Sequence, residues 1–247
     1  MVRQQQAVFQ SAHPEPPFWA VRFEIAQAPA AGCFVMLDLG GPLREPIFPA
    51  RLDSQGFTAL VPPGHPTTRL LPGTQVDLIG PQGHGFDIDG VKNLLLIAEA
   101  STLPPLLPLI QAAPFVALVL EASTRAQIPP ARRFPPTVEL HLLVHEKSTG
   151  HAGTSESKDE EARLLPLLQW AEKTCLSCNP KRYTELASLV RKARFTPSPG
   201  FAQALVQVPM PCGTGACEAC RIMTRHGERR ACVDGPVFDL LDLMLTD

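Results

Sequence analysis

The sequence lacks a large excess of charge of either sign. Its 22 lysines and arginines nearly balance 24 aspartates and glutamates, which leaves a formal net charge of −2. Proteins that bind nucleic acids or anionic membrane surfaces usually carry a strongly basic patch or tail. We therefore expect neither a nucleic acid nor a membrane surface as a partner.

The sequence also lacks a hydrophobic run long enough to span a membrane. A spanning helix needs ~20 consecutive apolar residues, and the richest stretch, 94–110, is interrupted by Glu99 and by three prolines. The first ten residues contain no apolar segment of the kind found in a secretory signal peptide. These absences predict a soluble, cytoplasmic protein, a compartment in which disulfides are rare.

Short apolar segments separated by glycine and proline occupy residues 1–89. The candidate strands are 18–25, 32–39, 56–61 and 74–79, and the segments between them contain Gly-Gly-Pro, Pro-Pro-Gly, Pro-Gly and Gly-Pro sequences. Such sequences mark turns, because proline fixes φ and glycine accepts positive φ. Short strands at regular intervals predict a small antiparallel β-barrel.

From residue 90 to residue 208, apolar strands alternate with helical segments. We expect strands at 94–98, 115–120, 138–144, 174–178 and 204–208, a polar segment at 147–161, and helices at 161–173 and 180–194. This alternation predicts a doubly wound α/β domain with a parallel sheet. Residues 209–247 would then form a third, small domain.

Four of the seven cysteines lie in this last segment, with four, two and eleven residues between them: Cys212, Cys217, Cys220 and Cys232. The C-x4-C-x2-C…C spacing is that of a plant-type 2Fe–2S cluster, whose irons are held by four thiolates. A cluster of this kind passes single electrons. The spacing therefore predicts an electron-transfer protein in which these four cysteines are the metal ligands.

The residues around the cysteines favour the same interpretation. Gly213 and Gly215 separate the first two cysteines, and glycines let a backbone approach a cluster closely and adopt positive φ. Segment 220–232 predicts a β-hairpin that turns at His226-Gly227. The hairpin would return Cys232 to the neighbourhood of Cys220.

Four cysteines also suit a zinc ion or two disulfides. Structural zinc sites usually show two C-x2-C pairs, whereas this segment has one such pair and a fourth cysteine that stands alone. Disulfides are disfavoured by the absence of a secretion signal. Cys175 and Cys178 form another C-x2-C pair, which we interpret as a buried pair at a strand end.

The order of barrel, α/β domain and cysteine domain resembles the electron transfer subunit of dihydroorotate dehydrogenase, within the ferredoxin reductase-like superfamily. The most similar segments are MPCGTGACEAC, ACVDGPVFD, GCFVMLDL and VDLIGPQGHGFDI. The resemblance implies FAD on the barrel, one 2Fe–2S cluster and NADH as electron donor. It also implies a hetero-oligomer with a catalytic flavoprotein of pyrimidine biosynthesis, in which this chain is an oxidoreductase component and not a stand-alone enzyme.

The flavin motif departs from the family pattern. Where the family has arginine, proline, an aromatic residue and serine or threonine, this sequence reads Glu45-Pro46-Ile47-Phe48, and the family's Gly-Thr pair appears as Thr67-Thr68. Glu45 would repel the phosphate that the family's arginine neutralises. The resemblance implies that the FAD-binding residues are Pro46, Ile47, Phe48 and Thr68, but the binding of FAD stays open.

The nicotinamide motif departs further. Residues 98–104 follow the first α/β strand and contain no glycine, although a glycine-rich turn is what lets backbone N–H groups cradle a diphosphate. The family's Cys-Gly-Pro, which lies by the nicotinamide, corresponds to Cys178-Asn179-Pro180. The resemblance implies that Cys178, Asn179 and Pro180 contact the nicotinamide.

Three hypotheses of function follow, and the third is a zinc-stabilised binding protein with no redox activity. In the first, the chain relays electrons from a reduced nicotinamide donor, through FAD if it is bound and through the cluster, to a partner flavoprotein such as dihydroorotate dehydrogenase. In the second, it is a degenerate relative: a relay with only the cluster, or a regulatory or interaction subunit without flavin or NADH activity.

Overall fold

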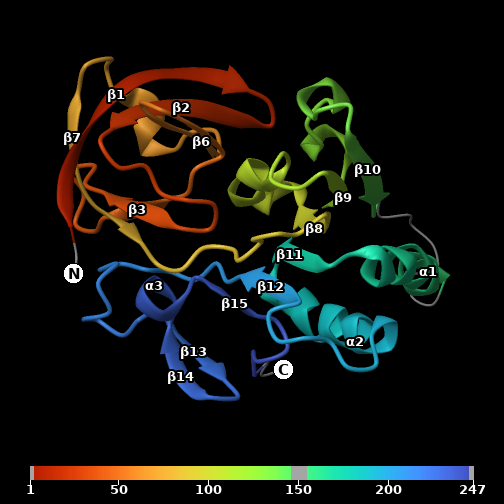
Figure 1. Ribbon diagram of the computed structural model, residues 1–247. Coiled ribbons are helices and arrows are strands. Elements are labelled where there is room, and N and C mark those ends of the chain that lie inside the picture. Colours follow the sequence, from red (N-terminus) through yellow and green to blue (C-terminus); the bar gives the residue numbers. More distant parts are fainter. Residues whose placement is uncertain (1–2, 146–154, 245–247) are drawn as a thin grey trace.

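The computed structural model describes residues 3–145 and 155–244. The N-terminal strands lie on one side of the molecule, the α/β domain on the other, and the cysteine-rich region below the junction of the two (Figure 1). Within the described residues, no helix is both long enough and apolar enough to cross a membrane.

The N-terminal part is a seven-stranded antiparallel sheet in the order β4-β3-β7-β1-β2-β6-β5. Its strands are β1 (Gln4–Glu15), β2 (Phe18–Ile25), β3 (Phe34–Leu37), β4 (Glu45–Ile47), β5 (Arg51–Asp53), β6 (Gly56–Val61) and β7 (Gln75–Gln82), with the 3-10 helix η1 (Pro66–Arg69) before β7. Only residues 48–50 separate the two edge strands, β4 and β5. The sheet must therefore curl until its edges meet, which confirms the predicted antiparallel barrel.

The barrel core is built from alternate residues of these strands. Phe9, Phe23 and Phe57 are fully buried, and Phe23 lies between the other two at ring-centroid distances of 5.6 and 5.5 Å. Strand β1 was not predicted from the sequence. Its glutamines face solvent on one side, and only Ala7 and Phe9 along it are fully buried.

The second sheet has the order β10-β9-β8-β11-β12-β15. Strands β8 (Asn93–Glu99), β9 (Phe115–Ala122), β10 (Val138–Val144), β11 (Lys173–Ser177) and β12 (Ala202–Leu205) are parallel. The chain enters at β8, winds outward to β10, and then returns to place β11 and β12 on the other side of β8. This topology confirms the predicted doubly wound domain, with β12 shifted from the expected 204–208.

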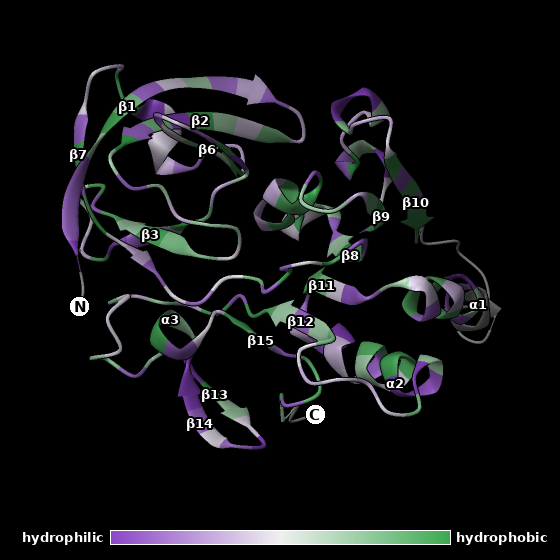
Figure 2. Cartoon of the chain, viewed as in Figure 1, coloured by the Kyte–Doolittle hydropathy of each residue, from purple (hydrophilic) through white to green (hydrophobic). Residues whose placement is uncertain are grey.

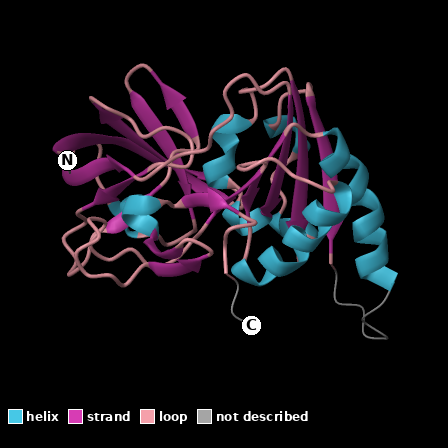
Figure 3. Ribbon diagram, turned by 60° about the horizontal axis from the view of Figure 1, so that its bottom comes forward, coloured by secondary structure: helices cyan, strands magenta, loops and turns pink. Residues whose placement is uncertain are grey.

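Helices cover both faces of the parallel sheet (Figure 3). One face packs against α1 (Ser155–Trp170) and α2 (Tyr183–Ala193), which follows the 3-10 turn η6 (Pro180–Arg182). The first of these helices begins earlier and ends earlier than the predicted 161–173, and part of the predicted polar segment 147–161 lies outside the described residues. Hydrophobic residues concentrate in the parallel strands and on the sheet-facing sides of the helices (Figure 2).

The opposite face is covered by 3-10 turns: η2 (Ala100–Thr102), η3 (Pro104–Leu109), η4 (Arg125–Gln127) and η5 (Ala131–Arg133). Three prolines lie within η3. Because proline has no N–H and clashes with the preceding turn, a regular α-helix cannot form there. Buried Leu103, Leu106 and Leu109 nevertheless pack on the sheet.

The cysteine-rich region contains the hairpin β13 (Arg221–Thr224) and β14 (Gly227–Arg230), the short helix α3 (Ala231–Asp234) and the strand β15 (Val237–Asp239). The hairpin is confirmed, with Thr224 paired to Gly227 at the turn. Strand β15 pairs antiparallel with β12, so the end of the cysteine segment becomes the edge of the α/β sheet. Just before it, Gly235 O accepts a hydrogen bond from His84 N of the barrel at 2.5 Å.

Candidate functional site

The four cysteines lie in two pairs where the C-terminal segment packs against the barrel. Cys220 and Cys232 are buried, and their sulfur atoms are 3.3 Å apart. Cys212 is half-buried and Cys217 is exposed, and Cys217 hydrogen-bonds to the sulfur of Cys212. The structure therefore brings the predicted ligands together two by two.

The hairpin explains how distant cysteines meet. Arg221 pairs with Arg230 at the base of the hairpin, and the next pair continues the ladder, because Ala231 N donates to Cys220 O at 2.9 Å. Cys232 follows one residue later, at the start of α3, and its thiol reaches back to Cys220. The prediction that the hairpin returns Cys232 to Cys220 is confirmed.

The loop between Cys212 and Cys217 wraps around the sulfurs. Gly213 has φ +63°, and a Cβ added there would lie 2.4 Å from Met36 Cγ, so only glycine fits against the barrel. The N–H of Thr214 donates to Cys212 Sγ at 3.4 Å, and the N–H of Gly215 donates to Cys232. Backbone N–H groups aimed at thiolates stabilise the negative charge of an iron–sulfur cluster.

The two pairs differ in how readily they ionise. Burial opposes ionisation of Cys212, but hydrogen bonds from Cys217 and Thr214 outweigh it and lower its pKa to about 6. In the other pair, burial and the adjacent Cys220 thiol raise the pKa of Cys232 to about 12. A bound metal ion deprotonates such a thiol outright, so Cys232 needs the metal in order to ionise.

The pairing distinguishes between kinds of metal centre. Across the described part of the chain, no three His, Cys, Asp or Glu side chains converge where they could hold one ion. A structural zinc ion needs four ligands around one centre, whereas a 2Fe–2S cluster takes two protein ligands on each iron. Four thiolates in two pairs are a donor set that fits a binuclear cluster.

A pocket of about 380 Å³ lies between the barrel and the α/β domain. Three of the four predicted flavin residues line it, namely Pro46, Ile47 and Phe48, together with residues of η2 and η3 and with Met210. Phe48 and Met210 also pack in the hydrophobic cluster that contains Cys220 and Cys232. The pocket and the buried cysteine pair therefore share a wall.

The fourth predicted flavin residue, Thr68, is not among the described residues that line this pocket. Its hydroxyl donates to the carbonyl of His65 at 2.8 Å, within the turn that begins η1. Thr67 is fully buried, and its hydroxyl lies 2.8 Å from His65 Nδ1. These two threonines stabilise the η1 turn.

Glu45, which was predicted to repel a flavin phosphate, pairs with a histidine. Glu45 Oε2 lies 2.8 Å from His65 Nε2, and His65 lines the pocket. Burial lowers the pKa of His65 despite the nearby carboxylate, so the imidazole is mostly neutral at pH 7. The described residues that line the pocket include no lysine or arginine. They fit a planar apolar ring such as that of a flavin, but they give the diphosphate of FAD no cation.

Charged side chains of the protein itself line the crevice at the carboxyl ends of β8 and β9. A pocket of about 230 Å³ there is lined by Glu99, Glu121 and Arg182, among others. Arg182 bridges Glu121, at 3.2 Å, and Glu160, and burial raises the pKa of Glu121 to about 7 although Arg182 opposes the rise. These carboxylates do not fit the diphosphate of a dinucleotide, which needs free N–H groups and positive charge.

The predicted nicotinamide residues are not among the described residues that line this crevice. Cys178 is buried, which raises its pKa to about 12. The N–H of Asn179 donates to Glu99 Oε1 at 2.9 Å, its side chain caps η6, and Pro180 is the first residue of η6. Their assignment to a nicotinamide stays a prediction. Sequence reasoning missed the Glu121–Arg182 pair because its members lie far apart in sequence, in unrelated segments.

Comparison with known proteins identifies similar sequences. Residues 209–244 match the family model described as the iron-sulfur cluster binding domain of dihydroorotate dehydrogenase B. The electron transfer subunit of dihydroorotate dehydrogenase B (NAD(+)) from Shouchella clausii is 27% identical over 221 residues, which cover 82% of this chain and 80% of the relative. The same subunit from Bacillus caldolyticus is 30% identical over 184 residues, covering 70% of this chain and 67% of the relative.

Solved structures show the same fold. The structure of NADH-dependent reduced ferredoxin-NADP oxidoreductase, which concerns flavin-based electron bifurcation, superimposes with a TM-score of 0.74 at 21% identity, covering 97% of this chain and 90% of that chain. The ferredoxin reductase in carbazole 1,9a-dioxygenase has a TM-score of 0.60 at 14% identity, covering 78% and 65%. At these identities the likeness concerns the fold, a ferredoxin reductase-like arrangement.

Proposed function

This chain belongs to the family of dihydroorotate dehydrogenase B electron transfer subunits, and from that premise we propose that it passes single electrons to a partner flavoprotein. Membership confirms the resemblance read from the sequence, and an iron–sulfur cluster binding domain is present at residues 209–244.

The observation that carries the proposal is the position of the cysteine pairs. Cys220 and Cys232 are buried against Phe48 and Met210, which also line the interdomain pocket, whereas Cys217 is exposed. One side of the site therefore faces the pocket and the other faces solvent. A path for electrons from the pocket to a partner docked near Cys217 follows from this arrangement.

We assign Cys212 and Cys217 to one iron of a 2Fe–2S cluster, and Cys220 and Cys232 to the other. When bound, the cluster supplies one-electron transfer. The protein holds the four thiolates, donates N–H groups from residues 214 and 215 to them, and excludes water from the inner pair.

We further propose that the pocket beside the cysteines holds the isoalloxazine ring of a flavin. Its walls at Pro46, Ile47 and Phe48 are apolar, and Gln207, Ser101 and Thr102 offer polar atoms at its edge. Ring systems of this kind are held by apolar contacts and a few polar groups. A ring bound here would be separated from the cysteines by the side chains of Phe48 and Met210.

The residues at the carboxyl ends of β8 and β9 do not fit the diphosphate of NADH. Glu99, Glu121 and Glu160 already occupy that crevice or pair with its arginine. An electron donor would instead have to reach the flavin pocket or the exposed side of the cluster. The partner follows from the relatives, which are subunits of dihydroorotate dehydrogenase B by name.

A second candidate is a relay that carries the cluster and no flavin. It is favoured by the Glu45–His65 pair, at 2.8 Å, which stands where the family has an arginine for the phosphate. In this version the barrel and the α/β domain position the cysteine segment and the partner surface.

The test is the cofactor content of protein purified without oxygen. We expect two irons and two acid-labile sulfides per chain, together with flavin, which its absorbance identifies. Iron and sulfide without flavin would favour the second candidate, and zinc without iron would refute both. Cys232→Ser should lose iron, whereas the control Cys175→Ser, which removes a fully buried thiol in β11, should keep it.

A further inference from the structure

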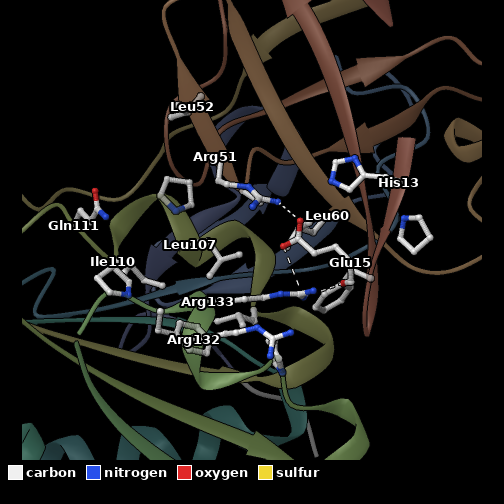
Figure 4. A pocket seen from close by; sticks show the side chains of 18 residues that line it. His13, Glu15, Arg51, Leu52, Leu60, Leu107, Ile110, Gln111, Arg132 and Arg133 are labelled. Carbon is white, nitrogen blue, oxygen red and sulfur yellow. Dashed lines mark hydrogen bonds and ion pairs between the residues drawn. The ribbon is translucent and has the colours of Figure 1, made fainter. Parts of the chain in front are cut away.

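A groove of about 870 Å³ separates the end of the β1–β2 hairpin from the turns of the α/β domain (Figure 4). One wall comes from β1, β2, β5 and β6 of the barrel, and the other from η3 and from residues 129–135. The groove is more than twice as large as the pocket of about 380 Å³ beside the cysteines. Nothing in the proposed electron transfer uses it.

The groove carries a concentrated positive charge. Three of its lining residues are arginines, Arg51, Arg132 and Arg133, against one carboxylate, Glu15. Within the described residues, the guanidinium of Arg132 has no hydrogen-bond or ion-pair partner, and the side chains of Arg132 and Arg133 both line the groove. Arginine clusters of this kind bind phosphates and carboxylates.

Glu15 shows where an anion is held. Arg51 Nη2 lies 2.5 Å from Glu15 Oε2. Arg133 Nη1 donates to the backbone carbonyls of Glu15 and Pro16 at 3.2 and 2.6 Å, and it lies 3.8 Å from Glu15 Oε1. The Glu15 side chain is only 13% exposed. The side chain of Arg51 is 54% exposed, and its guanidinium retains donors for a second anion.

Apart from His13 and Gln111, the rest of the lining is apolar. Phe18 and Phe134 are buried in the walls, and four prolines present their rings to the groove: Pro14, Pro108, Pro129 and Pro135. Flat apolar surfaces beside guanidinium groups suit a planar aromatic ring. A ligand that satisfies both parts of the groove has an aromatic ring and an anionic group.

We propose that this groove binds a planar aromatic ring that carries phosphate, as a nucleotide does, with the phosphate on the three arginines. Two sources share this chemistry. One is a free nucleotide. The other is the ADP half of a flavin dinucleotide, because Leu60 lines both this groove and the flavin pocket and the flavin pocket provides no cation. The second source rests on the proposed flavin function, whereas the first is independent of it.

The experiment is a calorimetric titration of the full-length protein, freed of any copurified flavin, with ADP, FAD and riboflavin. We expect Arg132→Ala to weaken the binding of ADP or FAD about tenfold, since a hydrogen bond between charged groups is lost. Riboflavin has no phosphate, so its affinity should not change. The control Arg191→Ala removes an exposed arginine from α2 and should leave all three affinities unchanged.

A second variant should strengthen the binding of ADP or FAD instead of weakening it. Glu15→Gln removes the carboxylate that pairs with Arg51, so the affinity for ADP or FAD should rise. A purely structural role of Glu15 would lower it instead. Circular dichroism of each variant checks that the fold is intact.

The outcomes separate the two proposals. Arginine-dependent binding of ADP supports the groove with a free nucleotide, and arginine-dependent binding of FAD alone supports the dinucleotide. If riboflavin fails to bind while ADP binds through the arginines, the flavin proposal fails and the groove stands. If neither ADP nor FAD binds, or if both bind equally well to Arg132→Ala, the groove proposal is overturned.

Discussion

Replacement of Glu121 by glutamine should stabilise the protein in a way that depends on pH. Burial raises the pKa of Glu121 from its ordinary value of 4.5 to about 7. An acid whose pKa is higher in the folded state favours folding while it is protonated, and the advantage is lost as pH rises from the unfolded value through the folded one. At about 1.4 kcal/mol per pKa unit, ionised Glu121 costs the folded state roughly 3 kcal/mol above pH 7.

Glutamine copies the protonated carboxyl and cannot ionise, so Glu121→Gln removes that cost. We expect a gain in the free energy of unfolding of about 1 kcal/mol at pH 5 and about 3 kcal/mol at pH 8. The assay is urea unfolding followed by circular dichroism, with wild-type and variant protein compared in the same metal state. Arg182 keeps Glu160 and Glu185 as partners in the variant.

Glu185→Gln is the matched control, because Glu185 also pairs with Arg182 but its side chain is 44% exposed. Its effect should be small at both pH values. The reasoning is refuted if Glu121→Gln changes stability equally at pH 5 and pH 8. It is also refuted if the variant is less stable at pH 8, because Arg182 would then compensate the burial of Glu121 in full.

Three further predictions concern the crevice and the cysteine loop. Arg182→Met should cost ~3–5 kcal/mol of unfolding free energy at pH 8, because it leaves buried Glu121 and Glu160 without a partner. The control Lys192→Met breaks an exposed pair with Glu161 and should cost less than about 1 kcal/mol. Equal losses in the two variants would contradict the assignment. Gly213→Ala should lower the iron content and the melting temperature more than Gly40→Ala does. Both glycines have positive φ, but only at Gly213 would the added Cβ lie 2.4 Å from Met36. Similar losses in the two variants would mean that the positive φ, and not crowding against Met36, causes the loss. In metal-free protein, iodoacetamide should modify Cys212 at pH 7 and leave Cys175 unmodified. The pKa of Cys212 is about 6, whereas burial strongly raises the pKa of Cys175. Mass spectrometry identifies the modified cysteines, and modification of Cys175 before Cys212 would refute the prediction.

The parts of the fold that the sequence predicted are those with local signals. The alternation of strands and helices predicted the doubly wound sheet, and the hairpin at His226-Gly227 was predicted from turn chemistry and short flanking strands. Cys212, Cys217, Cys220 and Cys232 could be selected as candidates because their spacing is itself the signal.

The rest depends on contacts between segments that are distant in the chain. Strand β15 is three residues long, and only its pairing with β12 makes it a strand. The crevice at β8 and β9 is filled by a glutamate from one strand and an arginine from a turn, 61 residues apart. The groove with three arginines joins β5 to η5, and no single stretch of sequence contains it.

Strands β12 and β15 are hydrogen-bonded neighbours in one sheet, and the entire cysteine segment between them leaves and re-enters that sheet. Both of its ends are therefore anchored, and the hydrogen bond from His84 to Gly235 ties its return to the barrel as well. A segment attached in this way cannot swing between a donor and an acceptor, as a domain on a single linker does. The distance between the interdomain pocket and the inner cysteine pair would therefore stay constant during electron transfer. The partner would dock on the surface beside Cys217.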